Sequence, residues 1–167
     1  MKKILLLLLF FWSPLFGEDS SLLSLGVGVF NVVKGKKSTN FQLEYRSNFA
    51  IYENQILLIR PLAGIMATTR KSSYYYGGIA FDIFITPSIV FTPSFAPGIY
   101  VKGDGKNLGF PLEFRSSAEL SYRFKNCTRL GAMFYHMSNA SIGHKNPGTE
   151  CLVFFLAVPV GFYTAGR

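Results

Sequence analysis

The fold is decided by the stretch from Leu112 to Phe124, which reads LEFRSSAELSYRF. Its apolar residues Phe114, Ala118, Leu120, Tyr122 and Phe124 alternate with the polar residues Glu113, Arg115, Ser117, Glu119 and Arg123. Successive side chains of a β-strand point to opposite faces of the sheet, so this alternation predicts a strand with one apolar and one polar face.

Seven other stretches share this two-residue period, and breakers such as Gly35, Pro87 and Asn126 separate them. With Leu112–Phe124, the predicted strands are Leu25–Val33, Thr39–Arg46, Gln55–Thr68, Tyr74–Ile85, Ile89–Lys102, Arg129–Asn139 and Glu150–Tyr163. Arg60 and Asp82 stand alone among apolar neighbours in two of them. The sequence therefore predicts an all-β fold.

Alternation by itself fits a soluble barrel with its apolar face inward and a membrane barrel with its apolar face outward. Three features favour an eight-stranded antiparallel transmembrane β-barrel: the long apolar face of the last strand, the mixed charges on the opposite faces and the even number of strands. In a barrel of this size, side chains would fill the narrow interior. Tyrosines near predicted strand ends fit an aromatic girdle, or simply β-propensity. They are Tyr74, Tyr75, Tyr76 and Tyr100.

The N-terminus has the pattern of a secretory signal peptide. Lys2 and Lys3 precede an apolar run from Ile4 to Phe16, which is too short to span a membrane as a helix. Residues 1–17 are the predicted signal peptide and residues 18–167 the barrel domain, although a retained N-terminal anchor is an alternative. Export argues against a nucleic-acid partner for the basic chain, and the mature part has no apolar run of about 18 residues that would form a spanning helix.

The predicted strands place Cys127 and Cys151 at opposite ends of two neighbours, on the order of 25–30 Å apart at about 3.3 Å per residue. A disulfide requires Cα atoms within about 7 Å of each other. We therefore expect free thiols without a catalytic role.

Three polar residues interrupt the apolar face of the last two strands. His136 and Ser138 are two residues apart, so they share a face, and a hairpin symmetric about Gly143 places His136 opposite Glu150. Cross-strand neighbours have Cβ atoms about 4.5–5.5 Å apart, a gap that an imidazole and a carboxylate can bridge. The pattern predicts a serine nucleophile, a histidine base and an orienting acid on the lipid side.

The loop between these strands offers donors for a tetrahedral oxyanion. Asn139 and the backbone N–H groups of Ala140 and Ser141 are the candidates. His144 lies in the same loop and is expected at the surface.

The loops at the end of the barrel opposite the chain termini carry an excess of basic residues. If the termini are periplasmic, these loops face outward, where the charges suit lipopolysaccharide phosphates or merely keep the loops solvated. These residues are Lys34, Lys36, Lys37, Arg70, Lys71, Lys102, Lys106 and Lys145.

At these residues the chain resembles the lipid A 3-O-deacylase family of the PagL type. The matching motifs run from His136 to Ala140 and from Asn146 to Glu150, and the stretch beginning at Leu112 is also similar. The resemblance implies an outer-membrane barrel that releases the 3-position acyl chain of lipid A without a metal or cofactor. Ser138 would be the nucleophile, His136 the base and Glu150 the orienting acid, with Asn139 as an oxyanion donor.

Ser141 departs from the pattern, because the family usually has glycine at this position. Its backbone N–H is retained, but a side chain restricts the conformations that the loop can adopt. The expected partners are lipid A and outer-membrane lipid, and the chain is expected to be a monomer or a homodimer.

Three alternatives stay open. Outer-membrane phospholipase A also has a His-x-Ser pattern, but that family has a larger barrel, calcium and an asparagine as its third member. A non-enzymatic adhesin or structural barrel is a second alternative, although the short loops offer little to present. A soluble lipid-binding barrel, which could be extracted without detergent, is the third.

Overall fold

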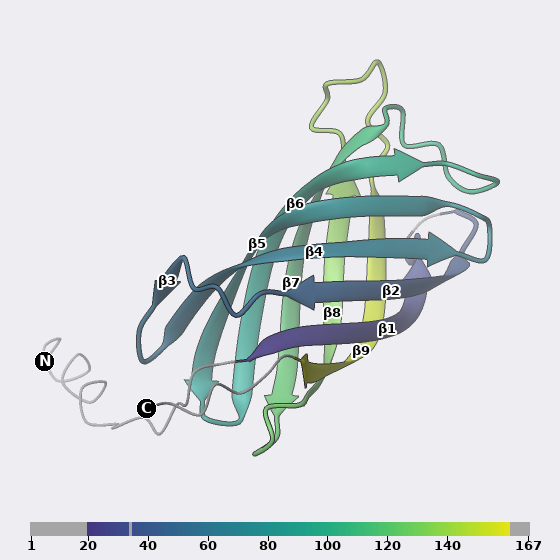
Figure 1. Ribbon diagram of the computed structural model, residues 1–167. Helices are drawn as coiled ribbons and strands as arrows, with labels where there is room; N and C mark the ends of the chain where they lie inside the picture. The colour runs from purple at the N-terminus through teal and green to yellow at the C-terminus, as the bar shows by residue number, and fades with distance from the viewer. Residues whose placement is uncertain (1–19, 34, 161–167) are drawn as a thin grey trace, which may run out of the picture.

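The computed structural model describes residues 20–33 and 35–160 as an antiparallel β-barrel (Figure 1). Eight long strands form its wall: β1 (Ser21–Phe30), β2 (Ser38–Arg46), β4 (Leu57–Thr68), β5 (Ser73–Thr86), β6 (Ile89–Val101), β7 (Leu112–Arg123), β8 (Arg129–Ser138) and β9 (Thr149–Val160). The short strand β3 (Tyr52–Glu53) pairs with the first residues of β4. Among the residues that the structure describes there is no helix with the length and hydrophobicity needed to span a bilayer.

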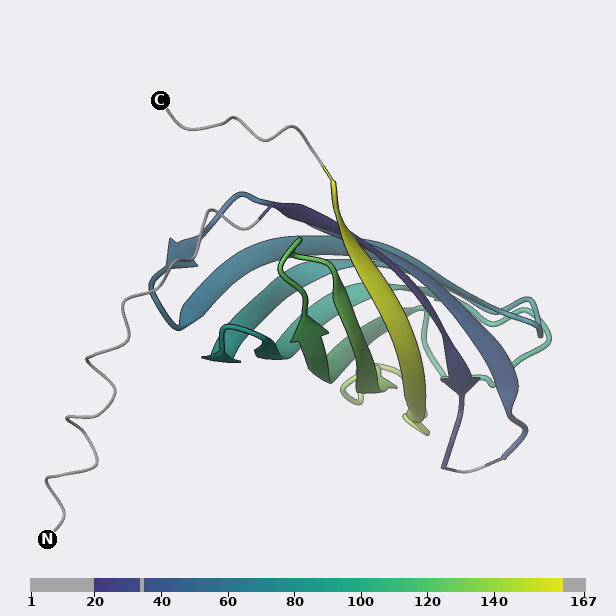
Figure 2. The same cartoon turned by 90° about the horizontal axis from the view of Figure 1, so that it is seen from below.

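The sheet closes on itself through two pairings of strands that are not joined by a tight turn. β1 pairs with β9 along its whole length, and β2 pairs with β4 from Arg46 opposite Leu62 to Asn40 opposite Thr68. Figure 2 shows the curved wall that results. Closure satisfies the edge hydrogen bonds of the long strands, which is what a barrel in lipid requires.

The apolar faces of the strands point outward. Leu25, Phe95, Leu120 and Phe154 are each about half exposed or more, whereas the polar residues on the opposite faces of the same strands are buried in the lumen. They include Ser24, Thr92, Glu119 and Thr149. This polarity is inverted relative to a soluble barrel and matches a barrel surrounded by lipid.

Buried ion pairs fill the lumen. Asp82 lies 3.0 Å from Arg129 and also pairs with Arg60, while Glu44 lies 2.7 Å from Arg115. Arg46 joins the two groups, because it contacts Glu44, Asp82 and Glu119. Each of these charges thus faces a charge of opposite sign, which offsets its cost of desolvation. The packed lumen leaves the outer face and the rims of the barrel as the places where chemistry can occur.

Several expectations need correction. Tyr74, Tyr76 and Tyr100 lie inside the barrel and are at most 6% exposed, so of the four tyrosines only Tyr75 faces outward. The first strand runs from Ser21 to Phe30 rather than from Leu25 to Val33, because its ladder with β9 begins at Ser21 opposite Val160. The predicted strand from Gln55 to Thr68 begins two residues later, as β4, and the short strand β3 that precedes it was not predicted. The predicted signal peptide and the end of the last strand at Tyr163 lie outside the described residues.

Candidate active site

The site lies on the hairpin of β8 and β9, near the end of the barrel opposite β3. The register places His136 directly opposite Glu150, as the symmetric hairpin predicts. Their side chains meet on the outer face, where His136 Nδ1 lies 3.2 Å from Glu150 Oε1. The two side chains are 48% and 30% exposed, so this pair lies outside the lumen and can be approached from the membrane side.

Ser138 follows on the same face of β8 and is partly exposed. Within the described residues no hydrogen bond joins the Ser138 hydroxyl to His136. Hydrogen bonds between a nucleophile and its base are often long before substrate binds, so the shared face is the relevant geometry. The Nδ1 contact with Glu150 leaves Nε2 as the nitrogen available to a hydroxyl.

A second serine lies across from His136 on the neighbouring strand β7. Ser116 of β7 lies opposite His136 in the register, and it is exposed on the outer face. The sequence alone had drawn attention only to Ser138. The alternation within β7 together with the β7–β8 turn is the signal that could have identified Ser116.

The loop from Asn139 to Gly148 is held by Asn139, which is fully buried. Its Nδ2 donates to the carbonyls of Leu108 at 2.9 Å and Lys145 at 2.8 Å, and its Oδ1 accepts the N–H of Ser141 at 3.0 Å. The backbone N–H of Asn139 donates to Asn146 Oδ1 at 3.1 Å. The Asn139 side chain therefore uses its donors to brace the loop from the lumen side, and they do not point toward the outer face.

The backbone beyond Asn139 turns through two left-handed residues, Ala140 with φ of 51° and Ser141 with φ of 64°. The N–H of Ala140 donates to no acceptor among the described residues, and Ala140 is exposed beside Ser138. Of the three predicted oxyanion donors, the Ala140 N–H is thus the one without a partner. Ser141 occupies a left-handed conformation that favours glycine, the residue that the resemblance leads us to expect there.

The loop between β6 and β7 supports the active-site loop from beside it (Figure 1). Leu108 of this loop is inserted into the core and is 1% exposed. Gly109 approaches so closely that an added Cβ would lie 2.1 Å from the carbonyl oxygen of Lys145. The position of Asn139 thus depends on a segment about thirty residues earlier in the chain, an interaction that local sequence patterns do not reveal.

The loop histidine and most of the basic loop residues singled out in the sequence lie at the surface. His144, Lys71, Lys102 and Lys145 are exposed, whereas the Lys106 ammonium donates to Asn31 Oδ1 at 2.9 Å. Lys34 lies outside the described residues. Both cysteines are free, with Cys151 buried. No cluster of metal-ligating side chains occurs in residues 20–33 and 35–160.

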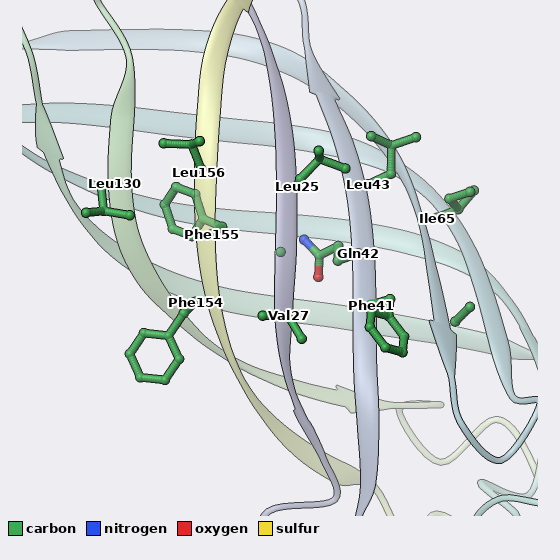
Figure 3. A pocket seen from close by; sticks show the side chains of 12 residues that line it. Leu25, Val27, Phe41, Gln42, Leu43, Ile65, Leu130, Phe154, Phe155 and Leu156 are labelled. Carbon is green, nitrogen blue, oxygen red and sulfur yellow. The ribbon is translucent and has the colours of Figure 1, made fainter.

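The outer face beyond the site is apolar. Leu152, Phe154 and Leu156 follow Glu150 on the same face of β9. Phe154 and Leu156 border a groove that crosses from β8 to β4, and Figure 3 shows Leu25, Val27 and Phe41 along it. Such a surface accepts hydrocarbon chains and excludes water.

Comparisons with known proteins agree with this architecture. The family lipid A 3-O-deacylase (PagL) matches residues 34–159. No curated protein matches the sequence. In structure, the chain is similar to the outer membrane enzyme PagL, with a TM-score of 0.69 and 19% identity over 83% of this chain and 99% of that one.

Two further barrels are similar in fold alone. A designed transmembrane β-barrel has a TM-score of 0.57 and 10% identity, covering 87% of this chain and 98% of its own. The outer membrane protein Ail of Yersinia pestis has a TM-score of 0.51 and 12% identity, covering 85% and 100%. The family match covers most of the chain and the fold agrees with it: this protein of the bacterial outer membrane belongs to the lipid A 3-O-deacylase (PagL) family.

Proposed function

We propose that this protein hydrolyses the 3-O-linked acyl ester of lipid A by means of Ser138, His136 and Glu150. The observation that carries the proposal is the contact of 3.2 Å between His136 Nδ1 and Glu150 Oε1 on the outer face, next to Ser138. A carboxylate on Nδ1 holds the imidazole in the tautomer whose Nε2 accepts a proton.

In the proposed reaction the Ser138 hydroxyl attacks the ester carbonyl while His136 takes its proton. The tetrahedral intermediate then expels the 3-hydroxyl of the sugar, which receives that proton, and an acyl-serine remains. Water, deprotonated by His136, attacks the acyl-serine and releases the fatty acid. The Ala140 N–H is the proposed donor to the oxyanion, and Asn139 maintains the loop that presents it.

The site on the outer face suits an acyl ester that stays in the bilayer. The apolar residues beyond Glu150 on β9 can contact the hydrocarbon chain while the ester lies at the rim. The exposed lysines of the loops at this end of the barrel supply charges that can pair with lipid A phosphates. The proposed partners are therefore lipid A and the surrounding membrane lipid.

The test uses the purified protein in outer-membrane vesicles, with lipid A and phospholipids analysed by mass spectrometry. We expect lipid A to lose one 3-hydroxyacyl chain, and Ser138→Ala to lower the rate by at least about 10³-fold. Ser116→Ala is the matched control, because it removes the other serine facing His136. Full activity of Ser138→Ala together with an inactive Ser116→Ala would show that Ser116, and not Ser138, is the nucleophile. Lysophospholipid as the main product would instead favour the phospholipase alternative.

A further inference from the structure

The connection between β2 and β4, residues 47–56, forms a hairpin with exposed apolar side chains. We call it the β3 hairpin. Phe49 is 66% exposed, Ile51 51%, Tyr52 50% and Ile56 45%. Its tip is polar and consists of Glu53, Asn54 and Gln55. Figure 1 shows it projecting at the end of the barrel where β4 begins.

Backbone hydrogen bonds hold this hairpin in place. Ile51 donates to the carbonyl of Ile59 at 2.8 Å, and Asn54 donates to Leu57 at 2.9 Å. The N–H of Phe84 on β5 donates to the carbonyl of Ile56 at 2.8 Å. The hairpin is therefore an ordered extension of the sheet, and the exposure of its apolar side chains does not come from an irregular chain.

The hairpin also continues the lipid-facing surface of the barrel. Tyr52 lies opposite Ile59 on β4, and Leu57 lies opposite Ile83 on β5, with Ile85 beyond at 61% exposed. These residues belong to the outward-facing set of their strands. At the same end of the barrel, the β7–β8 turn begins with the exposed Phe124 but is polar at its tip, where Lys125 and Asn126 are exposed.

We propose that the β3 hairpin inserts into the membrane leaflet at the end of the barrel opposite the active site, where Phe49, Ile51, Tyr52 and Ile56 contact phospholipid. Aromatic and aliphatic side chains on an ordered element next to a lipid-facing wall gain by leaving water, and aromatic rings favour the interface. The polar tip lies among the headgroups. The proposal rests on the membrane location of the barrel and is independent of the proposed catalytic residues.

Tryptophan fluorescence in vesicles of brominated phosphatidylcholine tests this proposal. Trp12, the only tryptophan in the sequence, lies in the predicted signal peptide, and a Trp12→Phe background leaves one introduced reporter even if this segment is retained. Phe49→Trp probes the hairpin, Phe154→Trp is the lipid-facing reference, and Lys125→Trp is the control in the polar turn. We expect bromine to remove about half or more of the Phe49→Trp emission, as for the reference, and to leave the control almost unchanged.

The folded state of each variant is checked by its heat-dependent gel mobility, and Ile51→Trp replaces Phe49→Trp if that variant does not fold. Strong quenching of the hairpin tryptophan by aqueous acrylamide, with bromine quenching no greater than that of Lys125→Trp, would overturn the proposal. A blue-shifted emission without bromine quenching would also overturn it, because the hairpin would then be covered by protein, such as a second copy. Since no substrate is present, loss of deacylase activity does not affect this result.

Discussion

Gly148 lies directly against the imidazole of His136: a Cβ at position 148 would be 2.8 Å from His136 Cε1 and 3.3 Å from Nε2. Gly148 has a φ of 56°, in the left-handed region that favours glycine. It precedes Glu150 by two residues, so the same short segment supplies the acid and the space for the ring that this acid orients. Gly148 is thus a positioning residue for the proposed base.

Gly148→Ala should displace the imidazole from Glu150, because the new methyl group and the ring would occupy the same space. We expect the deacylation rate to fall by roughly 10²-fold, the loss typical of a misplacement of about 1 Å in an active site. The matched control is Gly77→Ala, since a Cβ there meets nothing closer than 3.7 Å. Equal rates for the two variants would show that the position of the ring does not depend on Gly148.

Glu150→Gln keeps the shape of the side chain but removes its charge. An amide cannot stabilise the imidazolium and can favour the wrong tautomer of His136, so we expect the rate to fall by roughly 10²–10⁴-fold. Because Glu150 is partly exposed at the rim, the fold should be unaffected. Single-turnover kinetics with lipid A in vesicles measure the effect, and an unchanged rate would remove Glu150 from the proposed triad.

Asn139→Asp replaces two N–H donors by a carboxylate that faces the carbonyl oxygens of Leu108 and Lys145. Repulsion should open the loop that carries the Ala140 N–H, and we expect a loss of roughly 10²-fold in rate. Asn107→Asp is the control, because its Oδ1 only accepts the N–H of Gly109 and an aspartate can do the same. Hydrogen exchange of residues 139–148 distinguishes an opened loop from a direct effect on chemistry.

Ser141 holds a left-handed conformation, so Ser141→Gly and Ser141→Val should have different effects. Glycine relieves the backbone strain but loses more conformational entropy on folding, and these two effects oppose each other. The free energy of unfolding of Ser141→Gly should therefore change by less than about 1 kcal/mol, and activity should be retained. Valine should lower the free energy of unfolding by about 1–3 kcal/mol and reduce the rate. Urea unfolding in vesicles and rate measurements test both variants. A Ser141→Val variant as stable as the wild type would argue against strain at this position.

Asp82→Ala should destabilise the barrel without changing the active site. It removes a buried carboxylate that contacts both Arg60 and Arg129, and breaking a buried ion pair from one side typically costs about 3–5 kcal/mol. Asp104→Ala removes the exposed partner of Lys71, and we expect no measurable change in stability. Unfolding in urea compares the two variants, and the folded fraction of Asp82→Ala should keep the wild-type rate per molecule.

The alternation of the strands and the hairpin of β8 and β9 could be predicted because both are local properties of the chain. A strand alternates its faces with a period of two, so Phe114 and Arg115 must face opposite sides wherever the strand lies. The face that each strand presents limits the possible registers of the hairpin, and a loop centred on Gly143 places His136 opposite Glu150. The contact at the centre of the site followed from these two rules.

The tyrosines show where local rules fail. Tyr75 faces outward, whereas Tyr74 and Tyr76 fill the lumen, although all three share the same propensity for strands. Their faces depend on where β5 begins, which its ladders with β4 and β6 determine. A tyrosine near a predicted strand end is consequently not enough to indicate an aromatic girdle.

The sequence by itself determined that the chain forms strands with two unlike faces, and that an imidazole and a carboxylate meet on one of them. Only the tertiary structure decided the closure of β1 onto β9 and of β2 onto β4, the arginine partners of Asp82, and the insertion of Leu108 beneath Asn139. The reason is physical: period and turn geometry act over a few residues, whereas closure and buried charge pairing depend on segments that only the completed barrel brings together.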